Sequence, residues 1–303
     1  FFLIKSWMEF IKKDWTPHPT PKGYKRLALI IPCTKYKPYI TSREHKAINS
    51  SLLMDGWEPI GESNAPSELA KFIEDGDDPR IFHEGSLKKR NLILDRIVIS
   101  EPLGLVPYEY IYFWKGEQSP ATSYDDPGLF ESRGTSISPY RDDCTALKVS
   151  DKKWKWGDSE RNSYVYMHNY LAELIAFSLK RVSKNYHSIV AWVSPGLTHR
   201  SFLADHKIRT KEGIPKSRKV NGESKKLCGV LDITPEILEI MPTIEELKLS
   251  QQNLEKRLKK EGRYSSTNSV LSVYARGDGN DTPLGLKETL DFLQKRLNQI
   301  SNK

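Results

Sequence analysis

The sequence predicts an α/β protein with a short, mostly parallel β-sheet and helices on its faces. Three apolar runs of strand length carry this prediction, at residues 26–33, 95–102 and 187–195. None of them alternates apolar with polar residues, which is typical of strands buried on both faces. Helical patterns separate the runs, and strands that alternate with helices indicate a parallel sheet covered on both sides. Ligands bind to such sheets beyond the carboxyl ends of the strands.

The segment before the first strand has a helical period, in which Phe2, Met8, Ile11 and Trp15 can share one face. Charged residues interrupt this segment and no small-residue cleavage site follows it, so it is not a secretory signal peptide. We expect the chain to have three parts: an N-terminal helical segment at 1–23, a core α/β domain at 24–242 and a C-terminal helical extension at 243–303.

The rest of the chain mixes helical and strand patterns with two irregular segments. Residues 163–185 form the clearest helix, because the basic residues of its last turns suit the helix dipole. Residues 115–162 are rich in Gly, Pro, Ser, Tyr and Asp and are expected to be a loop-dominated insertion. Residues 206–226 lack an apolar period. The other expected elements are a strand at 228–233, a helix beginning near Pro235, a charged helix at 243–261, an edge strand at 269–277 and an amphipathic helix at 284–300.

Composition narrows the class of protein. The 47 Lys and Arg residues exceed the 39 Asp and Glu residues, and the formal net charge of +8 is compatible with a polyanionic partner without establishing one. No stretch approaches 18 uncharged apolar residues, which excludes a membrane-spanning helix. The three cysteines are far apart and form no CxxC pair, so they support neither a zinc ribbon nor a disulfide framework. A reducing, cytoplasmic location is therefore expected.

The segment that follows the first strand is the most unusual in the chain, with a thiol, lysines, tyrosines, hydroxyls and an imidazole at residues 33–45. Pro38 keeps Lys37 extended, because the residue before a proline avoids the helical region. Ser42 is expected to cap a helix, with His45 near the start of that helix. A helix N-terminus beside Lys37, Tyr39 and Ser42 would suit an anion. The segment thus predicts a polar pocket for a nucleotide, a base or a phosphate.

Two blocks of sequence resemble the archaeosine synthase family. The first is PCTKYKPYITSREH, in which Pro-Cys-Ser, Lys-Pro-Tyr, a Ser and a His recur at the family's spacing. Thr34 stands where the family usually has Ser, and the change preserves the hydroxyl. The second block is SEPLGLVPYE at 100–109, with a Pro-Leu-Gly and a Val-Pro. The resemblance covers roughly residues 24–205.

The resemblance implies a fold, an activity and partners. The fold is a three-layer α/β/α sandwich similar to that of uracil-DNA glycosylases. The family acts on 7-cyano-7-deazaguanine (preQ0) at position 15 of archaeal tRNA and joins free lysine to the nitrile of this base. A radical enzyme partner can then release archaeosine. The implied reaction uses neither a redox cofactor nor a metal.

The chain departs from the domain organisation of other family members. They carry a transglycosylase-like region before the core and an RNA-binding PUA domain after it. A chain of 303 residues has no room for the first, and its last 100 residues show no run of short strands for the second. The chain is therefore expected either to bind tRNA through its own basic residues or to depend on a separate PUA-type chain.

Nitrile chemistry assigns roles to residues of the two blocks. Cys33 can add to the nitrile and form a thioimide, which an amine then displaces; buried packing of this cysteine is the alternative. Glu101 can act as general base for the lysine amine, can bind the lysine ammonium or the base, or can be a solvated carboxylate. His45 either donates a proton or satisfies the helix start. The residues assigned to substrate binding are Lys37, Tyr39, Ser42, Pro102 and Gly104.

The basic stretch at 207–226 contains the residues assigned to RNA phosphates, which are Lys207, Arg209, Lys211, Arg218 and Lys219. A solvated mobile loop fits the same stretch equally well. His199 and His206 are seven residues apart, and we expect no metal site there. Two other functions stay open: a deazapurine- or nucleic-acid-binding relative without lysine transfer, and an RNA-binding subunit that needs a partner chain.

Overall fold

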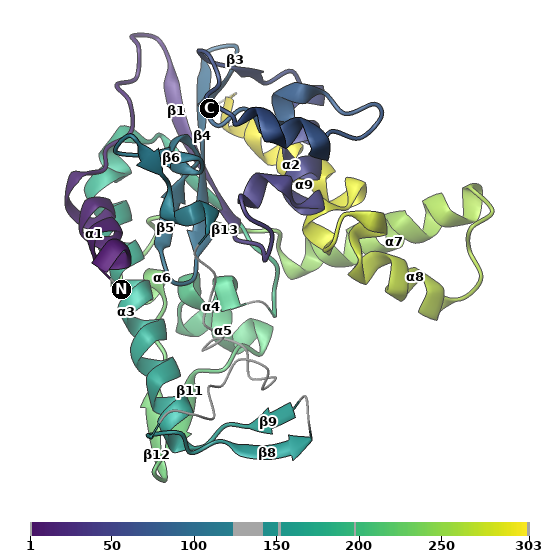
Figure 1. Ribbon diagram of the computed structural model, residues 1–303. Coiled ribbons are helices and arrows are strands. Elements are labelled where there is room, and N and C mark those ends of the chain that lie inside the picture. Colours follow the sequence, from purple (N-terminus) through teal and green to yellow (C-terminus); the bar gives the residue numbers. More distant parts are fainter. Residues whose placement is uncertain (1, 124–141, 151–152, 197, 302–303) are drawn as a thin grey trace.

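The protein is a mixed α/β structure around a seven-stranded sheet (Figure 1). The computed structural model describes residues 2–123, 142–150, 153–196 and 198–301. Four neighbouring strands are parallel to one another, in the order β13-β10-β1-β4. They span Glu239–Met241 (β13), Ser188–Trp192 (β10), Lys25–Pro32 (β1) and Leu92–Ser100 (β4). The predicted buried strands at 26–33, 95–102 and 187–195 are confirmed as β1, β4 and β10.

The outer edge of β4 is shared by two antiparallel strands. The first residues of β4 pair with β3 (Leu87–Lys89), which pairs in turn with β2 (Glu58–Pro59). The last residues of β4 pair with β5 (Gly104–Pro107). In the part of the chain that the structure describes, three small hairpins lie outside the sheet: β6–β7 (Phe113–Trp114 and Glu117–Gln118), β8–β9 (Leu147–Ser150 and Lys153–Lys155) and β11–β12 (Ser217–Val220 and Glu223–Lys226).

Helices lie on both sides of the sheet, as Figure 1 shows. On one side are α1 (Phe2–Glu9) and α3 (Asp158–Val182), and on the other are α2 (Arg43–Met54) and α9 (Lys287–Ser301). Three short helices follow β10 along the chain: α4 (Thr198–Leu203), α5 (His206–Glu212) and α6 (Val230–Ile233). No helix among the described residues is long and apolar enough to cross a membrane.

Several helices expected from the sequence are confirmed. The expected helices at 163–185, 243–261 and 284–300 are found as α3, as α7 (Ile244–Lys260) and as α9. The N-terminal segment is α1 followed by a π-helical turn at Phe10–Asp14. Ser42 caps α2 as expected, because its hydroxyl accepts a hydrogen bond from the backbone N–H of His45 at 3.2 Å.

Other sequence-based assignments are wrong, for identifiable reasons. The expected strand at 228–233 is helix α6, because the Asp232 carboxylate accepts the Gly229 N–H and closes a helix start. The expected edge strand at 269–277 is helix α8 (Thr267–Ala275), which Ser266 caps. The expected helix after Pro235 is strand β13, which pairs with β10. Residues 206–226 form α5 and the β11–β12 hairpin rather than a loop without structure. In each case a cap or a tertiary pairing overrides local propensity.

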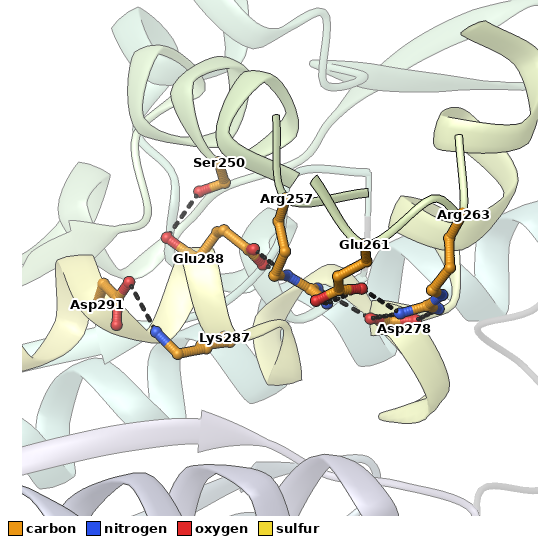
Figure 2. Close-up of polar contacts among 8 residues, drawn as sticks. All are labelled: Ser250, Arg257, Glu261, Arg263, Asp278, Lys287, Glu288 and Asp291. Atoms are coloured by element: carbon orange, nitrogen blue, oxygen red, sulfur yellow. Dashed lines mark hydrogen bonds and ion pairs between the residues drawn. The ribbon is translucent and has the colours of Figure 1, made fainter. Parts of the chain in front are cut away.

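The C-terminal helices α7, α8 and α9 pack against one another through two kinds of contact. A small apolar cluster joins Leu254, Leu258, Val270 and Leu286. Beside it, Figure 2 shows an ion-pair network centred on Arg257. The guanidinium of Arg257 lies 2.5 Å from the Glu288 carboxylate and 2.8 Å from that of Asp278, and Arg263 lies 2.6 Å from Asp278. The network ties α7 to α9 and to the turn before it.

Removing the centre of this network is expected to loosen the C-terminal helices. Arg257→Ala leaves the buried Glu288 carboxylate without its cation, so we expect the free energy of unfolding to fall by about 2–4 kcal/mol. Lys259→Ala, two residues further along α7, removes an exposed pair with Glu255 and should lower the stability far less. Urea unfolding of both variants measures the difference, and equal losses would show that the network does not stabilise the helices.

A buried carboxyl group joins the N-terminus of α2 to the C-terminal extension. Glu44 is almost fully buried, and the Thr282 hydroxyl donates a hydrogen bond to it. Burial raises the pKa of Glu44 to about 7, and the nearby Asp281 adds to this rise. Between about pH 4.5 and pH 7 the folded protein therefore keeps a proton on Glu44. The unfolded chain, with a pKa near 4.5, has already released this proton in the same range.

This carboxyl group makes stability depend on pH in a definite direction. Its contribution is fully present below pH 4.5 and is lost by the time the pH has risen through 7, because over this range the unfolded chain releases the proton that the folded protein still holds. Glu44→Gln keeps an acceptor for Thr282 and cannot ionise. We expect the wild type to lose about 2–3 kcal/mol relative to this variant between pH 5 and pH 8, as measured by urea unfolding. Parallel pH curves for the two proteins would contradict the assignment.

Candidate functional site

Two residues of the predicted site meet because their strands are parallel neighbours. Cys33 follows the last residue of β1, and Glu101 follows the last residue of β4. The register pairs Pro32 with Ile99, and the Cys33 N–H continues the ladder by donating to the Ile99 carbonyl at 2.9 Å. Both side chains therefore leave the sheet at its carboxyl edge, where ligands bind in this class of fold.

The third strand brings a histidine to the same place. His199 lies on α4, which follows β10, the neighbour of β1 on its other side. The Cys33 Sγ lies 3.1 Å from the His199 Nε2. A Glu101 carboxylate oxygen, this sulfur and a ring nitrogen of His199 all lie within 4.8 Å of one another. The segments that follow three neighbouring strands thus bring a thiol, an imidazole and a carboxylate close together.

His199 is a residue of the site that is not among those expected from the sequence, although the sequence contains a signal for it. The residues expected at the site follow the first two strands, and the carboxyl ends of parallel strands share an edge with the segment after 187–195 as well. That third segment contains His199 four residues beyond the strand. His206, which is seven residues beyond His199, is exposed, and its backbone N–H donates to Asp232.

The environment of His199 keeps its imidazole neutral. Burial lowers the pKa of His199 to about 4, and the nearby His45 lowers it further. A neutral ring can accept the Cys33 thiol proton through Nε2. The other ring nitrogen, Nδ1, is buried and has no hydrogen-bond partner among the described residues. The carboxylate of Glu101 therefore does not accept a hydrogen bond from this nitrogen. In a Ser-His-Asp triad, by contrast, the acid accepts such a bond from the histidine.

The first of the two sequence blocks begins with a loop after β1, and side chains of this loop hold it in place. The Lys37 ammonium donates to the Thr34 carbonyl at 2.6 Å and lies 4.6 Å from the centre of the Tyr39 ring. The Tyr39 hydroxyl is 2.8 Å from the hydroxyl of Ser100, the residue before Glu101. Tyr39 and Ser42 are buried, and Lys37 is half-buried. The loop thereby connects the ends of β1 and β4, and the assignment of these residues to substrate binding stays a prediction.

His45 is placed behind the site rather than in it. Its side chain is fully buried, with Nδ1 2.8 Å from the Tyr108 hydroxyl and Nε2 2.8 Å from the Pro32 carbonyl. Burial lowers the pKa of His45 to about 4, so the ring is neutral. Since Pro32 directly precedes Cys33, the geometry gives His45 a positioning role on the cysteine loop.

The Pro-Leu-Gly block builds the tight turn from β4 to β5. Pro102 and Gly104 are buried in this turn. Gly104 has a φ of +76°, and a Cβ atom there would lie 2.8 Å from the Leu174 Cδ2 on α3. Glycine is therefore required at this position for the backbone and for the close approach of α3. This turn sets the position of Glu101 at the end of β4.

The basic residues assigned to RNA fall into two groups. Lys207, Lys211 and Lys219 are exposed on α5 and on the β11–β12 hairpin. Arg209 is buried, and it donates to the carbonyls of Ala204, Ser201 and Pro215, so it supports the fold locally and does not face solvent.

The hairpin is connected to the site through Tyr164 of α3. The Arg218 guanidinium lies 5.1 Å from the centre of the Tyr164 ring. Burial raises the pKa of Tyr164, and the charge of the nearby Glu101 contributes to the same rise. The base of the basic hairpin therefore lies near the carboxyl edge of the sheet.

Comparison with known proteins adds no further assignment: no family model, no curated protein and no solved structure matches the chain.

Proposed function

We propose that the protein joins an amine of lysine to the nitrile of preQ0 in tRNA, a step of archaeosine biosynthesis. The observation that carries this proposal is the contact of 3.1 Å between the Cys33 thiol and the neutral His199 imidazole, beside Glu101. This is a nucleophile with a base, and a nitrile is an electrophile that such a pair can attack. The resemblance of residues 24–205 to archaeosine synthases supplies the substrate, and we extend it to a fold similar to that of uracil-DNA glycosylases.

In the first step that we propose, the Cys33 sulfur attacks the nitrile carbon. His199 takes the thiol proton through Nε2 as the carbon–sulfur bond forms. One π bond of the nitrile breaks, and its electron pair moves to the nitrogen. The imidazolium then gives this proton to the nitrogen, and the product is a thioimide. A ring with a pKa near 4 holds the added proton weakly, which favours its transfer onward.

In the second step, a neutral amine of lysine attacks the thioimide carbon. Glu101 receives the proton that the amine loses, since its carboxylate lies within 4.8 Å of the Cys33 sulfur. The carbon–sulfur bond then breaks, and the leaving thiolate regains a proton from Glu101. The product is an amidine that carries the lysine, and the enzyme returns to its starting state. No atoms or electrons beyond those of the nitrile and the amine are needed.

The surrounding contacts support this assignment by fixing the reacting groups. His45 holds the Pro32 carbonyl on one side of Cys33, and Tyr39 holds Ser100 on one side of Glu101. Such buried hydrogen bonds keep a site near its reactive geometry before the substrate binds. The tRNA would then approach along the basic hairpin, whose base lies near Glu101.

Neutralising the hairpin is expected to weaken tRNA binding and its dependence on salt. In the double variant Lys219→Gln/Lys226→Gln, we expect the slope of log affinity against log salt to become shallower by roughly 1.5, because two phosphate contacts are lost. Lys88→Gln/Lys295→Gln removes the same charge from exposed positions on β3 and α9. Filter binding at several salt concentrations compares them, and equal slopes for both variants would exclude the hairpin as the tRNA contact.

The reaction itself is tested with purified protein, preQ0-containing tRNA and labelled lysine. We expect label to enter the tRNA, and no label to enter tRNA that carries guanine at the same position. Label in free preQ0 but not in tRNA would replace the proposal with a relative that acts on the free base. Binding of tRNA without incorporation, restored by a second chain, would replace it with an RNA-binding subunit.

A further inference from the structure

We infer that Cys33, Glu101 and His199 also bind a zinc ion, which blocks the thiol. Among the described residues these three form the group of His, Cys and carboxylate side chains placed to hold a metal. Sulfur, nitrogen and oxygen are the three donor types that zinc takes from proteins. The blocking effect rests on the proposed function, whereas the binding itself does not.

The distances between the donors suit this ion. Zinc–ligand bonds of 2.0–2.3 Å in a tetrahedron place the donor atoms about 3.4–3.6 Å apart. The Cys33 sulfur and the His199 Nε2 are already 3.1 Å apart, and all three donors lie within 4.8 Å of one another. Small side-chain movements therefore bring all three onto one ion.

The donors converge on one point and do not form a chain. In a Cys-His-carboxylate chain the carboxylate would accept a hydrogen bond from the His199 Nδ1, which would place the imidazole between the acid and the sulfur. That nitrogen has no partner among the described residues, and the sulfur and the carboxylate oxygen approach each other within 4.8 Å. Convergence on one point is the arrangement that a metal ion requires.

The scaffold holds the donors while leaving the ion exchangeable. Cys33 is tied to β4 through the Ile99 carbonyl. Next to His199, the buried Arg200 donates to the carbonyls of Val193 and Pro242 and pairs with Glu212. Three protein ligands leave a fourth position open, as in exchangeable and catalytic zinc sites. A ligating histidine that lacks a partner on its other nitrogen binds zinc about 10- to 100-fold more weakly.

A zinc ion at this point would prevent the first step of the reaction. It would take the sulfur electron pair that must attack the nitrile, and it would occupy the Nε2 that must accept the thiol proton. The ion is therefore expected to act as a reversible inhibitor of this site.

Binding is measured on the full chain after chelator treatment. Zn²⁺ is titrated against a chromophoric indicator, and Co²⁺ is added separately to observe the sulfur-to-cobalt charge-transfer band. We expect one equivalent of either metal in the wild type, no charge-transfer band in Cys33→Ala, and at least tenfold weaker zinc binding in His199→Ala and Glu101→Gln. Cys228→Ala, which removes a different thiol, should bind like the wild type, and circular dichroism confirms that each variant is folded.

Two sets of outcomes separate this inference from the proposed function. Absence of saturable binding, or unchanged binding in Cys33→Ala, overturns the zinc site whatever the activity of the protein. If lysine transfer is detected, stoichiometric Zn²⁺ should lower its rate at least tenfold, and a chelator should restore it. A rate that rises with Zn²⁺ would overturn the blocking effect.

Discussion

Cys33→Ala is expected to lower lysine transfer to preQ0-tRNA at least about 10³-fold, because it removes the atom that attacks the nitrile. The affinity for tRNA should stay within threefold of the wild type, since the basic hairpin is untouched. Single-turnover incorporation of labelled lysine measures the rate, and filter binding measures the affinity. The loss should appear in the rate constant and not in the binding constant.

Two further cysteine variants serve as controls for this loss. Cys144→Ala and Cys228→Ala remove free thiols that lie outside the three-residue group, and both should transfer lysine like the wild type. Cys33→Ser replaces the thiol with a hydroxyl of similar size, which is a far weaker nucleophile, so this variant should resemble Cys33→Ala. Lysine transfer by Cys33→Ala at the wild-type rate would rule out covalent catalysis by this residue.

His199→Gln is expected to lower the same rate by about 10²- to 10⁴-fold, the usual contribution of a positioned general base. Glutamine fits the buried space but cannot accept and release the thiol proton at neutral pH. His206→Gln is the matched control, because His206 is seven residues further on and exposed. Single-turnover rates of both variants should differ by at least 100-fold.

Alkylation of Cys33 provides a readout of His199 that does not depend on tRNA. Iodoacetamide should modify Cys33 more slowly in His199→Gln than in the wild type, because the neighbouring base no longer assists the loss of the thiol proton. The modified peptide is quantified by mass spectrometry, with Cys228 as an internal reference. Equal alkylation of Cys33 in the two proteins would show that His199 has no influence on the thiol.

Three of the four parallel strands, and two of the three residues of the site, follow from the sequence because they depend on local pattern and on a topological rule. Buried runs without alternation identified β1, β4 and β10. Because parallel strands end at one edge, the residues that follow β1 and β4, which include Cys33 and Glu101, lie at that edge. The same rule holds for β10, which is followed by the helix that carries His199.

Other features depend on tertiary contacts that no local pattern reveals. His45 is buried with one ring nitrogen on the Tyr108 hydroxyl and the other on the Pro32 carbonyl, and Tyr108 is 63 residues away in the sequence. Arg209 stands in a basic stretch, yet it is buried, and its guanidinium donates to the carbonyls of Ser201 and Pro215. The two valines and the tyrosine at 269–277 are residue types favoured in strands, but the Ser266 cap and the packing of Val270 on Leu254 and Leu258 make this segment a helix.

The attack of Cys33 on the nitrile is tested most directly by intact-protein and peptide mass spectrometry of the protein incubated with preQ0-tRNA without lysine. After nuclease digestion, we expect the peptide that contains Cys33 to carry the mass of the preQ0 nucleotide, and this mass to disappear when lysine is added. The adduct should be absent in Cys33→Ala. An unmodified Cys33 in a preparation that transfers lysine at full rate would contradict the proposed mechanism.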